Sequence, residues 1–245
     1  MSDYDQQKIK NSFAKVYGSA GEAPKIIGLL KAFWPLLFLS LIFGYMLRVI
    51  LPFPYISFSF IGIFLVLISL MGIFLLVKGN RKLENYLKGA KGEEWVASQL
   101  AFLNSDHVVF NGMRLNKGRN NFDHIVLGPS CIFIIETKNW SGEITFSERH
   151  ATIDGKSIKY SPLNQVKEQS HELISFLNEN KCNDIPVKPV LCFIESKLKD
   201  PVSNINGVIV CSGNALIDVI TDQLMDPIND EAFLNTQNIL KSIIV

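Results

Sequence analysis

The sequence predicts an α/β domain preceded by a transmembrane helical hairpin, and three observations predict this fold class. Residues 32–77 contain two long apolar stretches with one charge in total. From residue 89 onward, amphipathic segments alternate with short apolar runs, as helices and strands do in an α/β domain. Two of these runs, Phe122–Leu127 and Cys131–Ile135, flank the turn signal Gly128-Pro129-Ser130 and are typical of neighbouring strands.

The composition separates an apolar part from a weakly acidic one. The chain has 245 residues, of which 48% are hydrophobic, and a formal net charge of +1. Residues 78–245 carry 18 Lys and Arg against 20 Asp and Glu, so this part has a net charge of about −2. The predicted domain therefore lacks the basic footprint expected of a tight nucleic-acid binder.

The cysteines do not form a metal-binding pattern. Cys131, Cys182, Cys192 and Cys211 lie far apart, with no C-x-x-C spacing and no histidine cluster. Such cysteines are typical of buried or incidental thiols in a reducing compartment, and they argue against a structural zinc site.

Both apolar stretches are long enough to cross a membrane. Ala32–Leu51 has Pro35 in its first turn and Arg48 near its end, and Ile56–Val77 has no charge. At about 1.5 Å per residue, each covers a hydrocarbon core of about 30 Å. The alternative is a pair of core helices in a soluble protein, but uncharged runs of this length are rare there. A short turn, Pro52-Phe53-Pro54-Tyr55, joins the two.

The positive charges flanking the spans predict their orientation. Lysines precede the first span, more lysines and an arginine follow the second, and the turn has no positive charge beyond Arg48. By the positive-inside rule, both termini lie in the cytoplasm of a two-pass plasma (inner) membrane protein. The expected parts are a cytoplasmic segment at 1–31, the spans at 32–77, a linker at 78–88 and a domain at 89–245.

Hydrophobic periodicity and the positions of proline and glycine predict the helices and strands of the domain. Proline at the first helical position favours a helix that begins at Ser161-Pro162 and ends near Asn178. Other expected helices are Glu93–Leu103, Asn214–Gln223 and Asp230–Ile243. Other expected strands are His107–Leu115, Gly142–Phe146, Ala151–Ile153, Val187–Ile194 and Gly207–Val210, with a turn at Asp154-Gly155.

Two acids and a lysine occur at the ends of the central strand pair. Glu136 and Lys138 share one face of the second strand because side chains alternate along a strand. If the two segments pair as a hairpin, Asp123 near the start of the first lies opposite the end of the second. Two carboxylates suit Mg²⁺ or Mn²⁺, and a lysine beside them can stabilise charge on a phosphoryl group. The alternative is an ordinary ion pair at a strand end.

Four ordered sequence blocks resemble the nuclease-related domain (NERD) family of the PD-(D/E)XK superfamily. The blocks cover about Gly89 to Asn180. They are Gly89-Ala90-Lys91-Gly92-Glu93, Phe122-Asp123-His124, the run from Ile135 to Gly142 (IETKNWSG) and Ser161-Pro162-x-x-Gln165. The resemblance implies a restriction-endonuclease-like mixed sheet flanked by helices, and metal-dependent phosphodiester hydrolysis, of DNA rather than RNA.

The resemblance also implies roles for individual residues. Asp123 and Glu136 would hold Mg²⁺ or Mn²⁺, Lys138 would assist the nucleophile, and Glu93 and Gln165 would support them. Glu93 also has a structural explanation, because a carboxylate in the first turn of a helix is favoured by the helix dipole. Gln165 is otherwise a surface amide.

A basic loop before Asp123 is the best candidate for phosphate contacts. It contains Arg114, Lys117 and Arg119, although a solvated basic loop is equally common. A second Glu-x-Lys, Glu195-Ser196-Lys197, has no strand-borne aspartate before it and is interpreted as a solvated strand end.

Two other functions remain open at this point. A membrane-anchored domain that keeps the fold but only binds nucleic acid or protein is favoured by the missing basic surface. A structural membrane protein with a surface Glu136–Lys138 ion pair would have Asp123 and Glu136 far apart.

Overall fold

The computed structural model describes residues 13–50, 58–115, 120–146, 151–182, 185–222 and 226–244. The chain divides into two compact units. One comprises Met1–Gly21 and Lys91–Val245, and the other is Glu22–Ala90. The first unit therefore combines a segment that precedes the second unit in the sequence with one that follows it.

The first unit is built on a seven-stranded mixed sheet with the order β1-β2-β3-β4-β8-β11-β10. β2, β3 and β4 form an antiparallel series, whereas β8 lies parallel to β4 and β11 parallel to β8. β1 pairs in parallel with β2, and β10 pairs antiparallel with β11. The strands are β1 Lys15–Tyr17, β2 Val108–Arg114, β3 Asn121–Leu127, β4 Ile132–Lys138, β8 Val187–Phe193, β10 Val202–Ile205 and β11 Val208–Ser212.

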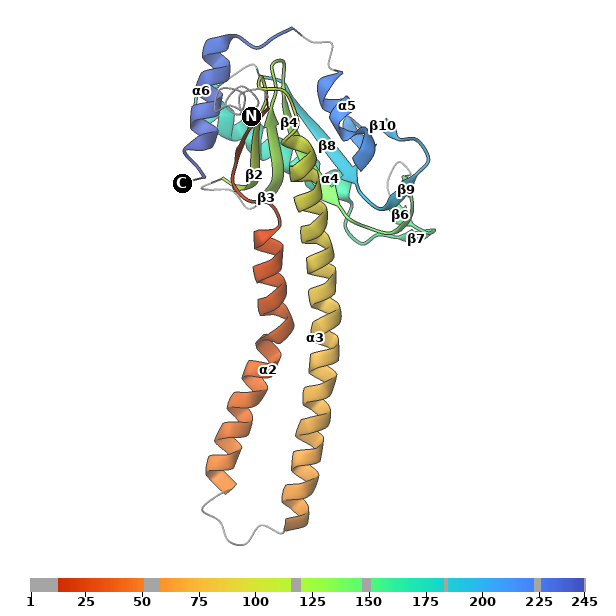
Figure 1. The fold of residues 1–245 in the computed structure, drawn as a ribbon. Coiled ribbons are helices and arrows are strands. Elements are labelled where there is room, and N and C mark those ends of the chain that lie inside the picture. Colours follow the sequence, from red (N-terminus) through yellow and green to blue (C-terminus); the bar gives the residue numbers. More distant parts are fainter. Residues whose placement is uncertain are drawn as a thin grey trace, which may run out of the picture. The chain divides into compact units, whose positions relative to one another are not determined.

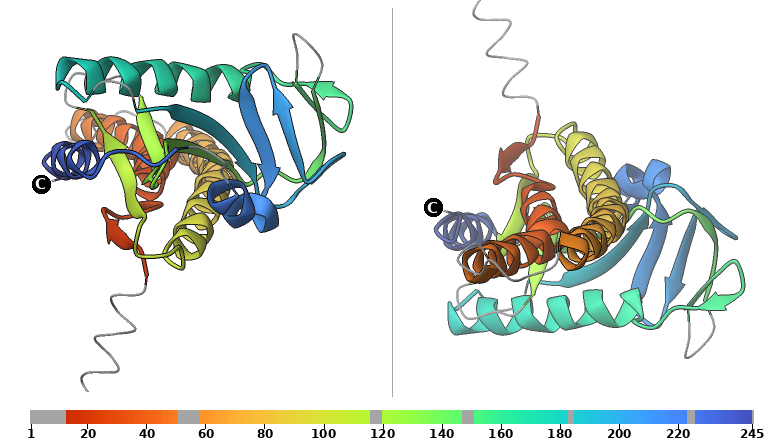
Figure 2. Two further views of the ribbon diagram at one scale, coloured as in Figure 1. Left: turned by 90° about the horizontal axis from the view of Figure 1, so that it is seen from above. Right: turned by 90° about the horizontal axis from the view of Figure 1, so that it is seen from below.

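Helices cover both faces of this sheet. α4 (Pro162–Glu179) and α6 (Asp230–Lys241) pack with the face that includes Ile132 and Ile134. The end of α3 (Phe58–Leu100) and α5 (Leu216–Thr221), which follows the short 3₁₀ helix Gly213–Ala215, pack on the face of Phe133 and Ile135. Figure 2 shows α4 lying along one side of the sheet. The buried strands are apolar on both faces, as expected for a sheet between two helical layers.

A second sheet has four strands in the order β7-β6-β5-β9; β5, β6 and β7 lie between β4 and α4 in the chain, whereas β9 follows β8. Its strands are β5 Gly142–Phe146, β6 Ala151–Ile153, β7 Lys156–Ser157 and β9 Ser196–Leu198. The predicted turn at Asp154-Gly155 is confirmed, and both residues have positive φ. The Asp154 carboxylate accepts a hydrogen bond from the backbone N–H of Glu143 at 2.8 Å, which fixes the start of β5.

The predicted α/β class, the central strand pair and the helix after Ser161 are confirmed. Four strands were not predicted: β1, β7, β9 and β10 are short and have exposed residues, so their apolar signal is weak. The predicted start of a helix at Glu93 is wrong. α3 begins at Phe58 and runs through the predicted linker 78–88, because no proline interrupts it. The helix-dipole explanation of Glu93 therefore fails, since Glu93 lies far from the first turn.

The second unit contains α2 (Glu22–Ile50) and the part of α3 up to Ala90. Within α2, Glu22–Val49 is long and apolar enough to cross a membrane, and among the described residues it is the one helix that meets this criterion. α2 begins earlier than predicted, so Pro35 lies inside the helix rather than in its first turn. The expected turn at 52–55 lies outside the described residues.

Small residues let α2 and α3 approach closely in this unit (Figure 1). A Cβ atom on Gly28 would lie 2.6 Å from the Cβ of Tyr86, and one on Gly79 would lie 2.7 Å from the carbonyl oxygen of Ala32. Lys31 Nζ donates a hydrogen bond to the Tyr86 hydroxyl at 3.2 Å. The helices are thus packed on each other near the ends that carry lysines.

Candidate active site

Asp123 and Glu136 lie on neighbouring strands in the first unit. His124 of β3 is paired with Ile135 of β4, so the residue before His124 faces the end of β4. Asp123 Oδ2 accepts the backbone N–H of Thr137 at 2.8 Å. Only 9% of Asp123 and 3% of Glu136 is exposed. The Glu136–Lys138 ion pair is therefore a largely buried one, unlike the surface ion pair of the structural alternative.

Three side-chain donors surround the Glu136 carboxylate. Lys138 Nζ and Gln165 Nε2 donate to Oε1 at 2.5 and 2.7 Å, and Gln169 Nε2 donates to Oε2 at 2.7 Å. A buried carboxylate needs such partners, because an unpaired charge away from water is costly. These three donors thus hold the Glu136 carboxylate in one orientation.

Lys138 faces the acids rather than the solvent. Its Nζ also donates to Gln165 Oε1 at 3.0 Å, and 17% of its side chain is exposed. The ammonium lies 5.9 Å from the centre of the Trp140 ring, a cation–π distance. Gln165 therefore bonds both Glu136 and Lys138 and is not a free surface amide.

Two polar residues of α4 that bond the chain around the start of β3, Gln169 and Glu172, were not predicted. With Gln165 they occupy positions i, i+4 and i+7, which form one line along a helix. Gln169 is buried and also donates to the backbone oxygen of Asn121 at 3.0 Å. Glu172 Oε2 accepts from the Asn120 side chain at 2.6 Å. This spacing of polar residues beside the apolar stripe of the helix can be seen in the sequence. It is the signal from which Gln169 and Glu172 could have been predicted.

Glu93 reaches the same acids from α3. Its Oε2 accepts the backbone N–H of Gly21 at 3.1 Å. The preceding Gly92 allows α3 to pass close to the end of β4, because a Cβ there would lie 2.7 Å from the Cβ of Asn139. The close approach of Asn139 thus explains why the second glycine of the G-x-x-G-E block, Gly92, has no side chain.

Burial and neighbouring carboxylates raise the pKa of both Asp123 and Glu93. Burial, followed by the neighbouring Glu136 and Glu93 carboxylates, raises the pKa of Asp123 well above its ordinary value. Burial, with a smaller contribution from Glu136, raises the pKa of Glu93 to about 7, while the Gly21 N–H acts in the opposite direction. Mutual repulsion of this kind is relieved by a cation.

The oxygen donors fit a hard divalent cation of the Mg²⁺ type. Mg²⁺ is commonly bound by one or two carboxylates together with substrate phosphates and waters. Asp123 and Glu136 supply that number. Within the described ranges, no cluster of three or more His, Cys, Asp and Glu is placed to hold a metal ion.

The predicted phosphate-binding residues are only partly placed. Arg114 is exposed at the end of β2, paired in register with Asn121. Lys117 and Arg119 lie outside the described residues. Glu195 and Lys197, the second Glu-x-Lys, are exposed at the end of β8 and in β9, as the solvated interpretation expects.

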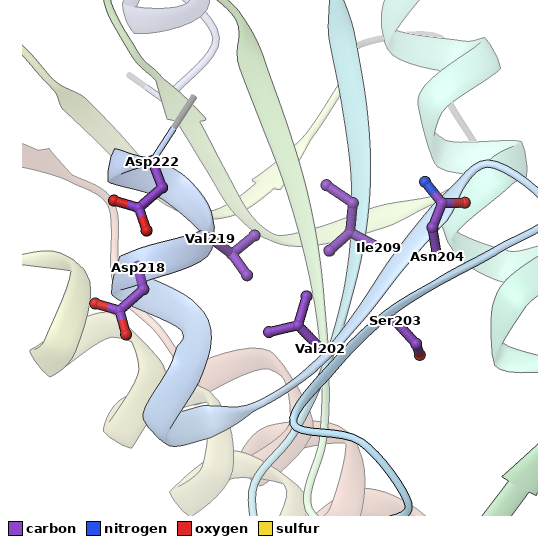
Figure 3. A pocket seen from close by; sticks show the side chains of 7 residues that line it. All are labelled: Val202, Ser203, Asn204, Ile209, Asp218, Val219 and Asp222. Carbon is purple, nitrogen blue, oxygen red and sulfur yellow. The ribbon is translucent and has the colours of Figure 1, made fainter. Parts of the chain in front are cut away.

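Other candidate groups lie apart from these acids. His124 is bonded to Asn111 at 2.8 Å, and burial lowers its pKa to about 3, so its ring is neutral. The four cysteines are buried free thiols, as predicted. A cavity of about 420 Å³ lies between β10, β11 and α5. Val202, Ile209 and Val219 form its apolar middle, and Asp218 and Asp222 lie to one side (Figure 3).

The comparisons with known proteins point to one domain family. No curated protein and no solved structure matches the chain. Residues 88–194 match the family model of the nuclease-related domain, NERD. This range contains Glu93, Asp123, Glu136, Lys138 and Gln165, so the site described above lies within a segment that is similar to a nuclease-related domain.

Proposed function

We propose that this chain is a membrane-anchored nuclease that hydrolyses phosphodiester bonds with Mg²⁺ or Mn²⁺, with DNA as its substrate. The proposal rests on one observation: Asp123, Glu136 and Lys138 lie together where two adjacent strands, β3 and β4, begin and end. The NERD match supports nuclease-like activity in general. The mixed sheet flanked by helices supports a restriction-endonuclease-like fold.

Each residue has a task that follows from its surroundings. Asp123 and Glu136 would hold the metal, and the chemistry it would supply is activation of water and polarisation of the phosphoryl group. Lys138, oriented by Gln165, donates to oxygens on which negative charge develops. Glu93, which interacts electrostatically with Glu136 and Lys138, supports these groups. Arg114, Lys117 and Arg119 contact phosphates.

The experiment that tests this function is a cleavage assay on the full-length protein in detergent. A fragment starting at residue 80 would lack β1 and Gly21, which belong to the same unit as the acids. Plasmid, linear DNA and RNA are each incubated with and without Mn²⁺. We expect DNA cleavage only with Mn²⁺. Binding of nucleic acid without turnover would instead favour the inactive binding domain, which the net charge of about −2 in residues 78–245 also favours.

A two-pass arrangement is part of the proposal, and the sheet supports it. β1 precedes α2, and it pairs with β2, which follows α3. A chain that crosses the membrane in α2 must therefore cross back before β2. The close contacts of Gly28 and Gly79 in the two-helix unit favour α3 as the returning span.

Reporters fused at Ser2 and at Val245 are expected to read cytoplasmic, and one inserted at Tyr55 should read external. The physical reason is the excess of lysine and arginine on both flanks of the spans. An external C-terminus would contradict the orientation. Termini on opposite sides would in addition contradict the β1–β2 pairing.

A further inference from the structure

Gln169 lies in the middle of α4 and is nearly inaccessible to solvent, with 1% of its surface exposed. Its side-chain nitrogen makes two hydrogen bonds, to Glu136 Oε2 at 2.7 Å and to the backbone oxygen of Asn121 at 3.0 Å. A carboxamide nitrogen has two N–H groups, so one serves each acceptor. Gln169 thus joins β4, which carries Glu136, to β3, where Asn121 lies two residues before Asp123.

These acceptors fix the orientation of the amide. The reverse orientation would place the Gln169 oxygen against a carboxylate and a carbonyl, neither of which can donate. With the observed orientation, Gln169 Oε1 is buried and has no partner among the described residues. A buried unpaired acceptor costs stability and calls for an explanation. An apolar residue such as the neighbouring Val166 or Leu173 would avoid that cost, so the two N–H groups are what the amide contributes.

The next turn of α4 repeats this link. Glu172 Oε2 accepts from the Asn120 side chain at 2.6 Å and from its backbone N–H at 3.4 Å. α4 therefore holds two consecutive residues at the start of β3. On the other side of Glu136, Lys138 and Gln165 occupy Oε1, so Gln169 is the one side chain among the described residues that holds Oε2.

We propose that Gln169 is a positioning residue of the site: it fixes the Glu136 carboxylate and its placement relative to Asp123, and thereby sets the affinity of the site for a divalent cation. The inference rests on the proposed function. It assigns Gln169 no contact with substrate or with the reacting atoms. Loss of a residue that orients a metal-binding carboxylate commonly lowers metal affinity or activity by about 10- to 100-fold.

The test replaces Gln169 with methionine in the full-length protein, because methionine is similar in length and has no N–H donor. Two quantities are measured: the Mn²⁺ concentration for half-maximal DNA cleavage, and the shift in melting temperature on adding Mn²⁺. Gln169→Met is expected to need about 10- to 100-fold more Mn²⁺ in both measurements. Its metal-free melting temperature should fall, because Glu136 Oε2 and the Asn121 carbonyl oxygen lose a buried donor, and removal of the unpaired Gln169 oxygen offsets only part of that cost.

Ser170→Ala is the matched control. Ser170 is the next residue on α4, is similarly buried and donates to the backbone oxygen of Val166, and no hydrogen bond joins it to Glu136. Its Mn²⁺ requirement should match wild type. Gln169→Leu replaces the methionine variant if that protein does not fold.

The outcomes separate this inference from the proposed function. If wild type cleaves with Mn²⁺ and Gln169→Met has the same Mn²⁺ requirement, the positioning role is overturned and the nuclease function stands. An equal rise in Gln169→Met and Ser170→Ala also overturns it, since any change in α4 would then suffice. A wild type that neither cleaves nor is stabilised by Mn²⁺ overturns both proposals.

Discussion

Asp123→Asn is expected to abolish Mn²⁺-dependent cleavage while leaving the metal-free protein as stable as wild type, or slightly more stable. The substitution removes one negative charge at nearly constant shape. Burial, followed by the neighbouring Glu136 and Glu93 carboxylates, raises the pKa of Asp123. Without a cation their repulsion destabilises the folded state, so the neutral amide relieves it.

The gain from Asp123→Asn should grow with pH. Because the pKa of Asp123 in the folded protein lies well above its unfolded value, Asp123 binds its proton more tightly when folded. The associated stability is present at low pH and is lost as the pH rises through the folded pKa. Metal-free melting temperatures of the two proteins should therefore be close at pH 5 and differ more at pH 8.

Melting curves with and without Mn²⁺, recorded beside the cleavage assay, decide the role of Asp123. A ligand that binds only the folded state stabilises it by mass action, so wild type should melt at a higher temperature with Mn²⁺ and the variant should shift little. Asp218→Asn, at an exposed aspartate of α5, is the control and should behave as wild type. Equal Mn²⁺-induced shifts in wild type and Asp123→Asn would remove Asp123 from the site.

Lys138→Met is expected to reduce cleavage at least about 100-fold while metal binding is retained, because a charge-stabilising donor at a reacting group is commonly worth that much. A protonated amine donates and cannot be a metal ligand. Unlike Asp123→Asn, this change should lower metal-free stability, by about 3 kcal/mol at neutral pH, since it leaves the buried Glu136 carboxylate without its cation. Mn²⁺ should restore much of that loss.

Lys197→Met supplies the matched control for Lys138. Lys197 occupies the same place in the second Glu-x-Lys but is exposed on β9. Its cleavage rate and melting temperature should equal those of wild type. Cleavage by Lys138→Met at the wild-type rate would make Lys138 a bystander, and unchanged metal-free stability would contradict its pairing with the buried carboxylate.

The relative placement of Asp123, Glu136 and Lys138 could be predicted, because it depends on short-range sequence patterns. The alternation in Ile132–Lys138 placed Glu136 and Lys138 on one face, and the turn at Gly128-Pro129-Ser130 placed Asp123 opposite them. Gln165 was predicted from the Ser161-Pro162-x-x-Gln165 block, whereas Gln169 on the same helix was not predicted. Its burial could not be foreseen, because a glutamine four residues further along faces either solvent or a buried acid depending on what packs above it.

The sequence by itself determined the α/β class, the central strand pair, the helix after Ser161 and an apolar segment long enough to cross a membrane, since each is encoded in local periodicity. Only the tertiary structure decided that Lys15–Tyr17 joins the sheet and that Gly21 bonds Glu93. The tertiary structure alone also showed that Gln165 and Gln169 of α4 donate hydrogen bonds to Glu136. These contacts join residues far apart in the chain, and such partners are selected by packing and by the need to pair buried polar groups, which no local pattern records.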